Sequence, residues 1–197
     1  MVNNGTALQK LWAANALGTV AYYNPENCVV IAGEGAISPL VELVQTGTDQ
    51  QKEHAAYALG IFSFANAENR VKIARAGGIP ILMALLQTGT DKLKEWGASV
   101  LGYLTMEKDE NRVAIARSGA ITPLVALLRV GTGKQKQQTA FALGLLAFNN
   151  AENRTAIARD GAIPPLVTLL RAGTDSQKEE AAYVWAILPT ATARTAW

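Results

Sequence analysis

A repeat of 42 residues runs through most of this chain and limits the folds that it can adopt. The glycines Gly35, Gly77, Gly119 and Gly161 are each 42 residues apart, and twelve of the 42 positions hold the same residue in all four copies. In the first copy these positions are Glu26, Asn27, Ile31, Ala32, Gly35, Ile37, Leu40, Leu43, Gly47, Thr48, Lys52 and Ala56. A period of this length predicts a solenoid, because a single unit cannot bury its apolar face and must stack on its neighbours.

Three helices are predicted within each repeat from the residues that begin and end them. A short first helix opens near Glu68 and ends before Gly77, where a positive φ costs nothing. The second helix is expected to start where a hydroxyl or a proline stands in the first turn, at Ser38-Pro39, Thr122-Pro123 and Pro164-Pro165. The third and longest helix is expected to follow a capping threonine such as Thr48. No segment alternates with a period of two, so we expect no sheet.

The segment NRVAIARSGAITPLVALLRVGT, from Asn111 to Thr132, together with the AFALG pattern at 140–144, resembles the armadillo repeat. The resemblance implies an all-α fold: a right-handed α-solenoid with three helices per 42-residue unit, in about four units plus an N-terminal partial unit. The short first helix argues against a HEAT array, whose units usually have two helices. We expect a single solenoid over 1–188, with a partial unit at 8–23, units at 24–65, 66–107, 108–149 and 150–188, and a C-terminal tail at 189–197.

Composition and charge exclude several functional classes. The 18 Lys and Arg and 16 Asp and Glu give a net charge of +2, which is too small to predict a nucleic acid or a membrane as a partner. Cys28 and His54 are the only cysteine and histidine, so we expect no disulfide framework, no metal site, no cofactor and no enzymatic activity. Neither a signal peptide nor a long apolar span is recognised, so we expect a cytoplasmic or nuclear protein.

The third helix of each repeat is predicted to have a core face and a ligand face. On a helical wheel Ala55, Leu59 and Phe62 share one side, and Tyr57 lies opposite. The armadillo resemblance implies that the side of Tyr57 lines a concave groove that holds an extended peptide. We therefore expect a non-catalytic module for protein–protein interaction, whose partner is a protein or a peptide.

The predicted groove residues come mainly from three columns, a column being the set of residues at one position in successive repeats. Aromatic side chains recur in them, and these offer a large contact area at a low entropy cost. Two glutamates, Glu53 and Glu95, could contact a basic ligand. The full set is Trp12, Asn15, Glu53, His54, Tyr57, Ile61, Glu95, Trp96, Ser99, Tyr103, Gln138, Phe141, Leu145 and Tyr183.

A fourth column, Tyr22, Phe64, Met106 and Phe148, has two interpretations. It either lines the same groove or is buried between neighbouring helices, because a helix that is apolar on all sides is usually buried.

A further position departs from the family pattern. Resemblance to importin-like and catenin-like proteins implies an asparagine ladder that holds the peptide backbone, but that position holds Thr19, Ile61, Tyr103, Leu145 and Ile187 here. Binding of a nuclear-localisation peptide in the importin manner is therefore not expected.

The short first helices carry a ladder of arginines, Arg70, Arg112 and Arg154, which the first repeat replaces with Cys28. The ladder either forms an anion-binding strip or lies on a solvated face. In the second case the arginines pair with Glu68, Glu110 and Glu152. We favour the solvated face, because exposed ion pairs of this kind are common and weak.

The ends of the predicted solenoid carry apolar residues without a neighbouring unit to cover them. This pattern supports an alternative function as a self-associating scaffold, or as part of a longer armadillo array, assembled through its uncapped ends as a homo-oligomer. The residues expected to take part are Leu8, Leu11, Trp185, Leu188 and Trp197.

Overall fold

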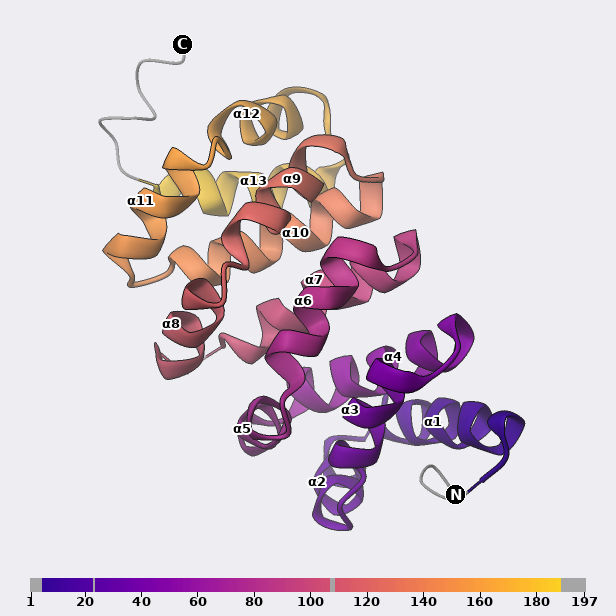
Figure 1. Cartoon of the computed structure of the whole chain (residues 1–197). Coiled ribbons are helices and arrows are strands. Elements are labelled where there is room, and N and C mark those ends of the chain that lie inside the picture. Colours follow the sequence, from indigo (N-terminus) through magenta and orange to yellow (C-terminus); the bar gives the residue numbers. More distant parts are fainter. Residues whose placement is uncertain (1–4, 23, 107–108, 189–197) are drawn as a thin grey trace. The chain divides into compact units, whose positions relative to one another are not determined.

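The computed structural model describes residues 5–22, 24–106 and 109–188, and almost all of them are α-helical (Figure 1). The chain divides into two compact units, Met1–Glu107 and Lys108–Trp197. The first unit contains α1 (Ala7–Tyr22), α2 (Pro25–Gly33), α3 (Ile37–Thr46), α4 (Asp49–Ala65), α5 (Ala67–Arg75), α6 (Gly78–Thr88) and α7 (Asp91–Leu104). The second contains α8 (Asp109–Arg117), α9 (Ile121–Val130), α10 (Gly133–Ala147), α11 (Ala151–Arg159), α12 (Ile163–Ala172) and α13 (Asp175–Ile187). The described ranges hold no strand, so the all-α class is confirmed.

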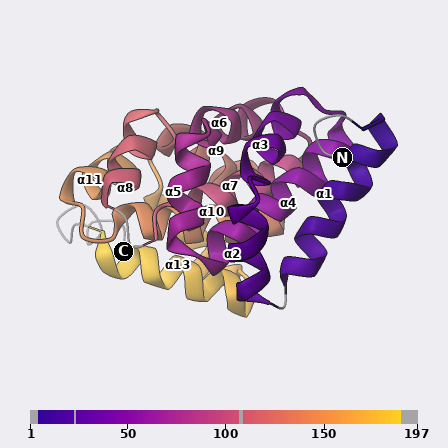
Figure 2. The ribbon, with the colours of Figure 1, turned by 90° about the horizontal axis from the view of Figure 1, so that it is seen from below.

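The third helices of successive repeats pack against one another within each unit. In the first unit α1 lies beside α4 and α4 beside α7, while α3 and α6 cover them on one side (Figures 1 and 2). In the second unit α10 lies beside α13, and α9 and α12 cover them in the same way. The third helices thus form one layer and the second helices another.

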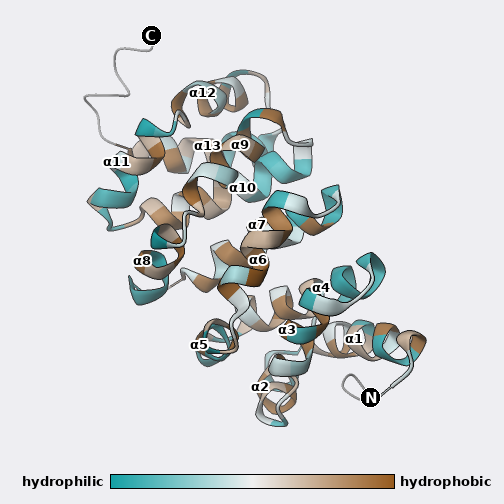
Figure 3. Cartoon of the chain, in the orientation of Figure 1, coloured by the Kyte–Doolittle hydropathy of each residue, from teal (hydrophilic) through white to brown (hydrophobic). Residues whose placement is uncertain are grey.

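The third helices begin as the sequence predicts. Thr48, Thr90, Thr132 and Thr174 are the N-cap residues, and each hydroxyl accepts a hydrogen bond from a backbone N–H in the first turn. In three of these helices the side-chain oxygen of a glutamine at the third position accepts a hydrogen bond from the threonine N–H, which completes a capping box. Figure 3 shows the first turns of α4 as hydrophilic and its later turns as hydrophobic, since the buried apolar side chains of α4 lie beyond its first turn.

The predicted hydroxyl caps of the second helices are wrong. Helices α3 and α9 start at Ile37 and Ile121, one residue before Ser38 and Thr122, and neither has a side-chain cap. The backbone closes the turn instead. Gly35 has φ +80° and the Ala36 N–H donates to Ile31 O at 3.3 Å, which is the bond of a Schellman motif. This turn leads directly into the next helix, so no capping hydroxyl is needed.

The predicted core face of the third helix is confirmed in α4, where Ala55, Leu59 and Phe62 are buried. Their counterparts in α7 and α10 are also buried, but Trp185 in α13 is only half-buried. Within the described ranges no single helix is long and apolar enough to cross a membrane, although the bent pairs α2–α3 and α8–α9 reach that length and composition together. The single-solenoid boundaries stay a prediction, and the predicted tail, 189–197, lies outside the described residues.

Candidate functional site

Three aromatic side chains on consecutive helices contact one another in the first unit. The rings of Tyr22 on α1 and Tyr57 on α4 have centroids 6.4 Å apart. Tyr57 in turn meets Trp96 on α7, with centroids 5.4 Å apart and ring planes inclined at 64°. The edge-to-face arrangement of this second pair is favourable for aromatic rings. We call Tyr22, Tyr57 and Trp96 the aromatic row.

Glycines on the preceding helix make room for two rings of this row. A Cβ atom on Gly18 of α1 would lie 2.7 Å from the Tyr57 ring, and one on Gly60 of α4 would lie 3.4 Å from the Trp96 ring. The rings therefore lie directly on the backbone of the neighbouring helix. Any larger residue at Gly18 would push Tyr57 out of the row.

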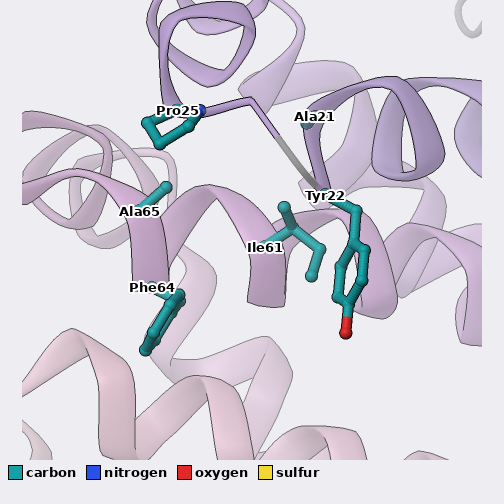
Figure 4. A pocket seen from close by; sticks show the side chains of 6 residues that line it. All are labelled: Ala21, Tyr22, Pro25, Ile61, Phe64 and Ala65. Carbon is teal, nitrogen blue, oxygen red and sulfur yellow. The ribbon is translucent and has the colours of Figure 1, made fainter.

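A cavity of about 410 Å³ adjoins one end of the aromatic row. Figure 4 shows the rings of Tyr22 and Phe64 on either side of Ile61, with Pro25 at the start of α2 nearby. Tyr22 and Phe64 are about half exposed or more, at 51% and 62%. Phe64 also meets Tyr103 edge to face, with centroids 5.4 Å apart. The arrangement offers an open apolar pocket of a size suited to one or two side chains. We call this the Phe64 pocket, lined by Ala21, Tyr22, Pro25, Ile61, Phe64 and Ala65.

The acidic residues of the predicted groove already have partners within the first unit. The Glu95 carboxylate lies 2.9 Å from the Lys92 ammonium, which also lies 5.4 Å from the centre of the Trp96 ring. The Glu53 carboxylate accepts a hydrogen bond of 3.3 Å from the Thr90 hydroxyl. These contacts reduce the electrostatic attraction that the surface offers to a basic ligand.

Most of the predicted groove residues in the first unit lie in the aromatic row or near it, but two do not. Ser99 is buried and its hydroxyl donates to Glu95 O at 3.1 Å, so it adds no exposed group. Trp12 is exposed but lies on the opposite edge of α1, in a separate apolar cavity. Its counterpart Trp96 reaches the row because α4 lies beside it, whereas no third helix precedes α1 among the described residues. The half-buried residues of this set are Asn15, Glu53, His54, Tyr57, Ile61, Glu95, Trp96 and Tyr103.

The groove residues predicted in the second unit are half-buried or exposed. Gln138, Phe141 and Leu145 on α10 are half-buried. Tyr183 on α13 is exposed, and its ring would lie 2.7 Å from a Cβ atom on Gly144. Burial is the main cause that raises the pKa of Tyr183, while Arg112 lowers it and Glu180 raises it further. The Tyr183–Gly144 contact thus repeats the Tyr57–Gly18 contact of the first unit.

Five of the six residues of the Phe64 pocket are absent from the predicted groove set: Ala21, Tyr22, Pro25, Phe64 and Ala65. The sequence placed Tyr22 and Phe64 in a column with two interpretations, and their exposure decides for the open surface. Pro25 opens α2 and has no equivalent proline in the other repeats, so repeat comparison gives no signal for it.

The arginine ladder is structural, and the expectation of a solvated face is wrong for it. Arg70 and Arg112 are buried. The Arg70 guanidinium donates to Ser63 O at 2.9 Å, and that of Arg154 donates to Ala147 O at 3.3 Å. Arg70 and Arg154 each reach back to a carbonyl in the last turns of the preceding third helix, which lacks a helical partner there. The Arg112 guanidinium pairs with the Asp109 carboxylate instead. No anion-binding strip is therefore needed to explain the ladder.

The residues predicted for self-association differ widely in exposure. Leu8 is exposed and Leu11 is half-buried at the start of α1. Trp185 is half-buried, and Leu188 is only 3% exposed, so the prediction that Leu188 presents an uncovered apolar surface is wrong. It lies on the same side as the core column of Phe62 and packs inward. Trp197 lies outside the described residues.

Comparison with known proteins shows which folds this geometry resembles. The Armadillo/beta-catenin-like repeat family matches residues 150–184. The designed armadillo repeat protein YIII(Dq)4CqI superposes with a TM-score of 0.91 at 22% identity, covering 98% of this chain and 83% of that protein. The chain has the fold of armadillo repeat proteins. No curated protein matches it in sequence.

Natural and ligand-bound armadillo structures are similar to this chain as well. The armadillo repeats only protein from Plasmodium falciparum has a TM-score of 0.79 at 19% identity, covering 91% of this chain and 80% of that one. A designed armadillo repeat protein in complex with the peptide (KR)4 has a TM-score of 0.88 at 23% identity, covering 97% and 81%. At the position where the armadillo resemblance implies an asparagine, this chain has Ile61 and Tyr103, which line or adjoin the Phe64 pocket.

Proposed function

We propose that this chain binds an extended segment of another protein along the aromatic row and the Phe64 pocket, without catalysing a reaction. The observation that carries the proposal is the exposure of Phe64 and Tyr22 around an open apolar cavity. Exposed aromatic groups that gather at a concave site are typical of binding surfaces. A related design was made for modular peptide recognition, and another is bound to a peptide, which supports a peptide as the partner.

The partner segment is expected to bind through side chains more than through its backbone. The asparagine position holds Ile61 and Tyr103, which cannot form the paired amide contacts of an asparagine ladder. The cavity beside Ile61 suits an aliphatic or aromatic side chain. Because Glu95 is paired with Lys92, a run of basic residues gains less here than on an uncompensated acidic surface. We therefore expect a segment with one apolar anchor residue and few charge requirements.

Selection from a random peptide library on the immobilised full chain, followed by titration of the selected peptides, tests the proposal. The Phe64→Ser variant should weaken binding by about tenfold or more, as a central aromatic contact does. Phe148→Ser is the matched control, since Phe148 occupies the same column in the second unit and is also exposed. Failure to enrich any peptide, or equal affinity for the wild type and Phe64→Ser, would contradict the proposal.

A further inference from the structure

The junction between consecutive third helices contains a polar contact that occurs in both units. The Gln51 side-chain N–H donates to Ala7 O at 2.7 Å, and that of Gln177 donates to Gly133 O at 2.7 Å. In each case a glutamine in the first turn of one third helix holds the first carbonyl of the third helix before it. The same glutamine accepts from its own N-cap threonine through Oε1, which fixes the orientation of its amide.

An aromatic ring against a small residue completes the junction. Tyr57 lies on Gly18 in the first unit, and Tyr183 lies on Gly144 in the second. Trp96 occupies the corresponding place on Gly60. Each junction thus has two sides. The ring side carries an aromatic residue and a glutamine or the residue that replaces it. The small-residue side carries a backbone carbonyl and glycines or alanines.

Helix α1 presents a ring side that no other helix covers in the described structure. Gln9 occupies the column of Gln51, and its Oε1 accepts from the Thr6 N–H at 2.9 Å, as in a capping box. Its amide N–H groups have no partner among the described residues. Trp12, in the column of Trp96, is 57% exposed beside a cavity of about 750 Å³. The walls of this cavity are Leu8, Gln9, Trp12, Ala13, Ala16, Leu17, Val20 and Ile31.

Helix α13 presents the matching small-residue side. Ala182 and Ala186 are exposed, whereas their counterparts one repeat earlier, Ala140 and Gly144, are buried. The first carbonyl of α13 belongs to Asp175, which occupies the column of Ala7 and Gly133. The described chain therefore carries the two halves of one junction on two different helices.

We propose that a second copy of this chain docks head to tail, with α13 of one copy on α1 of the next. The Ala182 and Ala186 surface would then face Trp12, as Gly60 faces Trp96 within the first unit. The Gln9 amide would donate to the Asp175 carbonyl, as Gln51 donates to Ala7. An interface of this kind joins two different surfaces, so it leaves one ring side and one small-residue side open and allows further copies to add.

Two charge variants and their mixture test this proposal on the full chain. By light scattering coupled to size exclusion, the wild type should show a mass above 20.9 kDa that rises with concentration between about 10 μM and 1 mM. Trp12→Glu and Ala186→Glu, each alone, should be monomeric, because every copy lacks one of the two surfaces. An equimolar mixture should form dimers and nothing larger, since only one productive pairing remains. Both sites are exposed, so circular dichroism should show unchanged helix content.

Control variants distinguish this junction from other modes of association. Val130→Glu, at an exposed apolar residue on α9, should assemble as the wild type does. Gln9→Ala should weaken the mixed dimer by about two- to tenfold, which corresponds to one hydrogen bond. A wild type that stays monomeric throughout would overturn the proposal. So would assembly by Ala186→Glu alone, which indicates symmetric pairing through α1, or a mixture that fails to form dimers.

Discussion

Cys28 takes the place of Arg70 in the repeat and forms the equivalent hydrogen bond. The Cys28 thiol donates to Ala21 O at 3.4 Å, and the Arg70 guanidinium donates to Ser63 O at 2.9 Å. Ala21 and Ser63 occupy the same column near the ends of α1 and α4. In three of the four repeats a donor in this column therefore reaches a carbonyl near the end of the preceding third helix, and a charge is not required.

Replacing Arg70 with alanine should destabilise the fold. The change removes a buried hydrogen bond and leaves Ser63 O without this donor, so we expect the free energy of unfolding to fall by about 1–3 kcal/mol. Urea unfolding followed by circular dichroism measures the change. Arg75→Ala, at an exposed position on the same helix, should stay within about 0.5 kcal/mol of the wild type. A loss as large for Arg75→Ala as for Arg70→Ala would contradict the structural role of the ladder.

The thiol of Cys28 should react slowly in the folded protein. Burial raises its pKa, only partly offset by a backbone hydrogen bond, so little reactive thiolate forms near neutral pH. Alkylation by iodoacetamide at pH 8 should be at least about tenfold slower in buffer than in denaturant, where local protection is lost. Equal rates in both solutions would show that the thiol is accessible and that α2 does not hold it against α1.

Stability measurements should separate the aromatic surface from the core. Leu101 is fully buried, and Leu101→Ser should cost about 3 kcal/mol or more. Phe64→Ser, at a side chain 62% exposed, should cost less than about 1 kcal/mol. Thermal or urea unfolding of the two variants provides the comparison. If Phe64→Ser unfolds as readily as Leu101→Ser, the Phe64 pocket belongs to the core and is not a binding site.

The stability of the second unit should depend on the protonation of Glu180. Burial, with a smaller contribution from Glu179, raises the pKa of Glu180 above its ordinary value of 4.5. The folded chain then binds more protons than the unfolded chain just above pH 4.5, so this group makes folding less favourable as the pH rises through that range. Glu180→Gln should therefore raise Tm at pH 7, by less than about 2 °C because the side chain is partly exposed.

The pH dependence provides the check on this assignment. The gain from Glu180→Gln should largely disappear by about pH 3, where Glu180 is protonated in both states. Glu42→Gln, at an exposed glutamate on α3, should leave Tm unchanged at both pH values. A lower Tm for Glu180→Gln at pH 7, or the same gain at both pH values, would contradict the assignment.

The sequence predicts the helices well because the repeat shows four copies of every signal. Thr48 and its counterparts cap the third helices, and Gly35 and its counterparts adopt positive φ, as their residue types require. The start of α3 is not predictable in this way. Ser38 has the residue type of a cap, but the backbone bond from Ala36 to Ile31 already closes the turn. Such a bond depends on how two consecutive helices are joined, and the residue type of Ser38 does not reveal it.

The site is predictable only in part, because the position of a residue within its repeat does not show which neighbouring helices cover it. Trp12 and Trp96 share a column, yet Trp96 packs on α4 while Trp12 is exposed. The burial of Arg70 is not predictable from its residue type, because its long side chain folds back over the preceding helix. The exposure of Phe64 likewise depends on helix packing, since α4 is apolar on several sides.

Photo-crosslinking of a library-selected peptide to the full chain tests the central proposal most directly. A benzophenone at the anchor position of the peptide should react with residues that line the Phe64 pocket, as mapped by mass spectrometry. These are Ala21, Tyr22, Pro25, Ile61, Phe64 and Ala65. Unlabelled peptide should suppress these adducts. The account predicts that they dominate in the wild type and are lost in Phe64→Ser. Adducts confined to the open face of α1, to the second helices or to the second unit would contradict it.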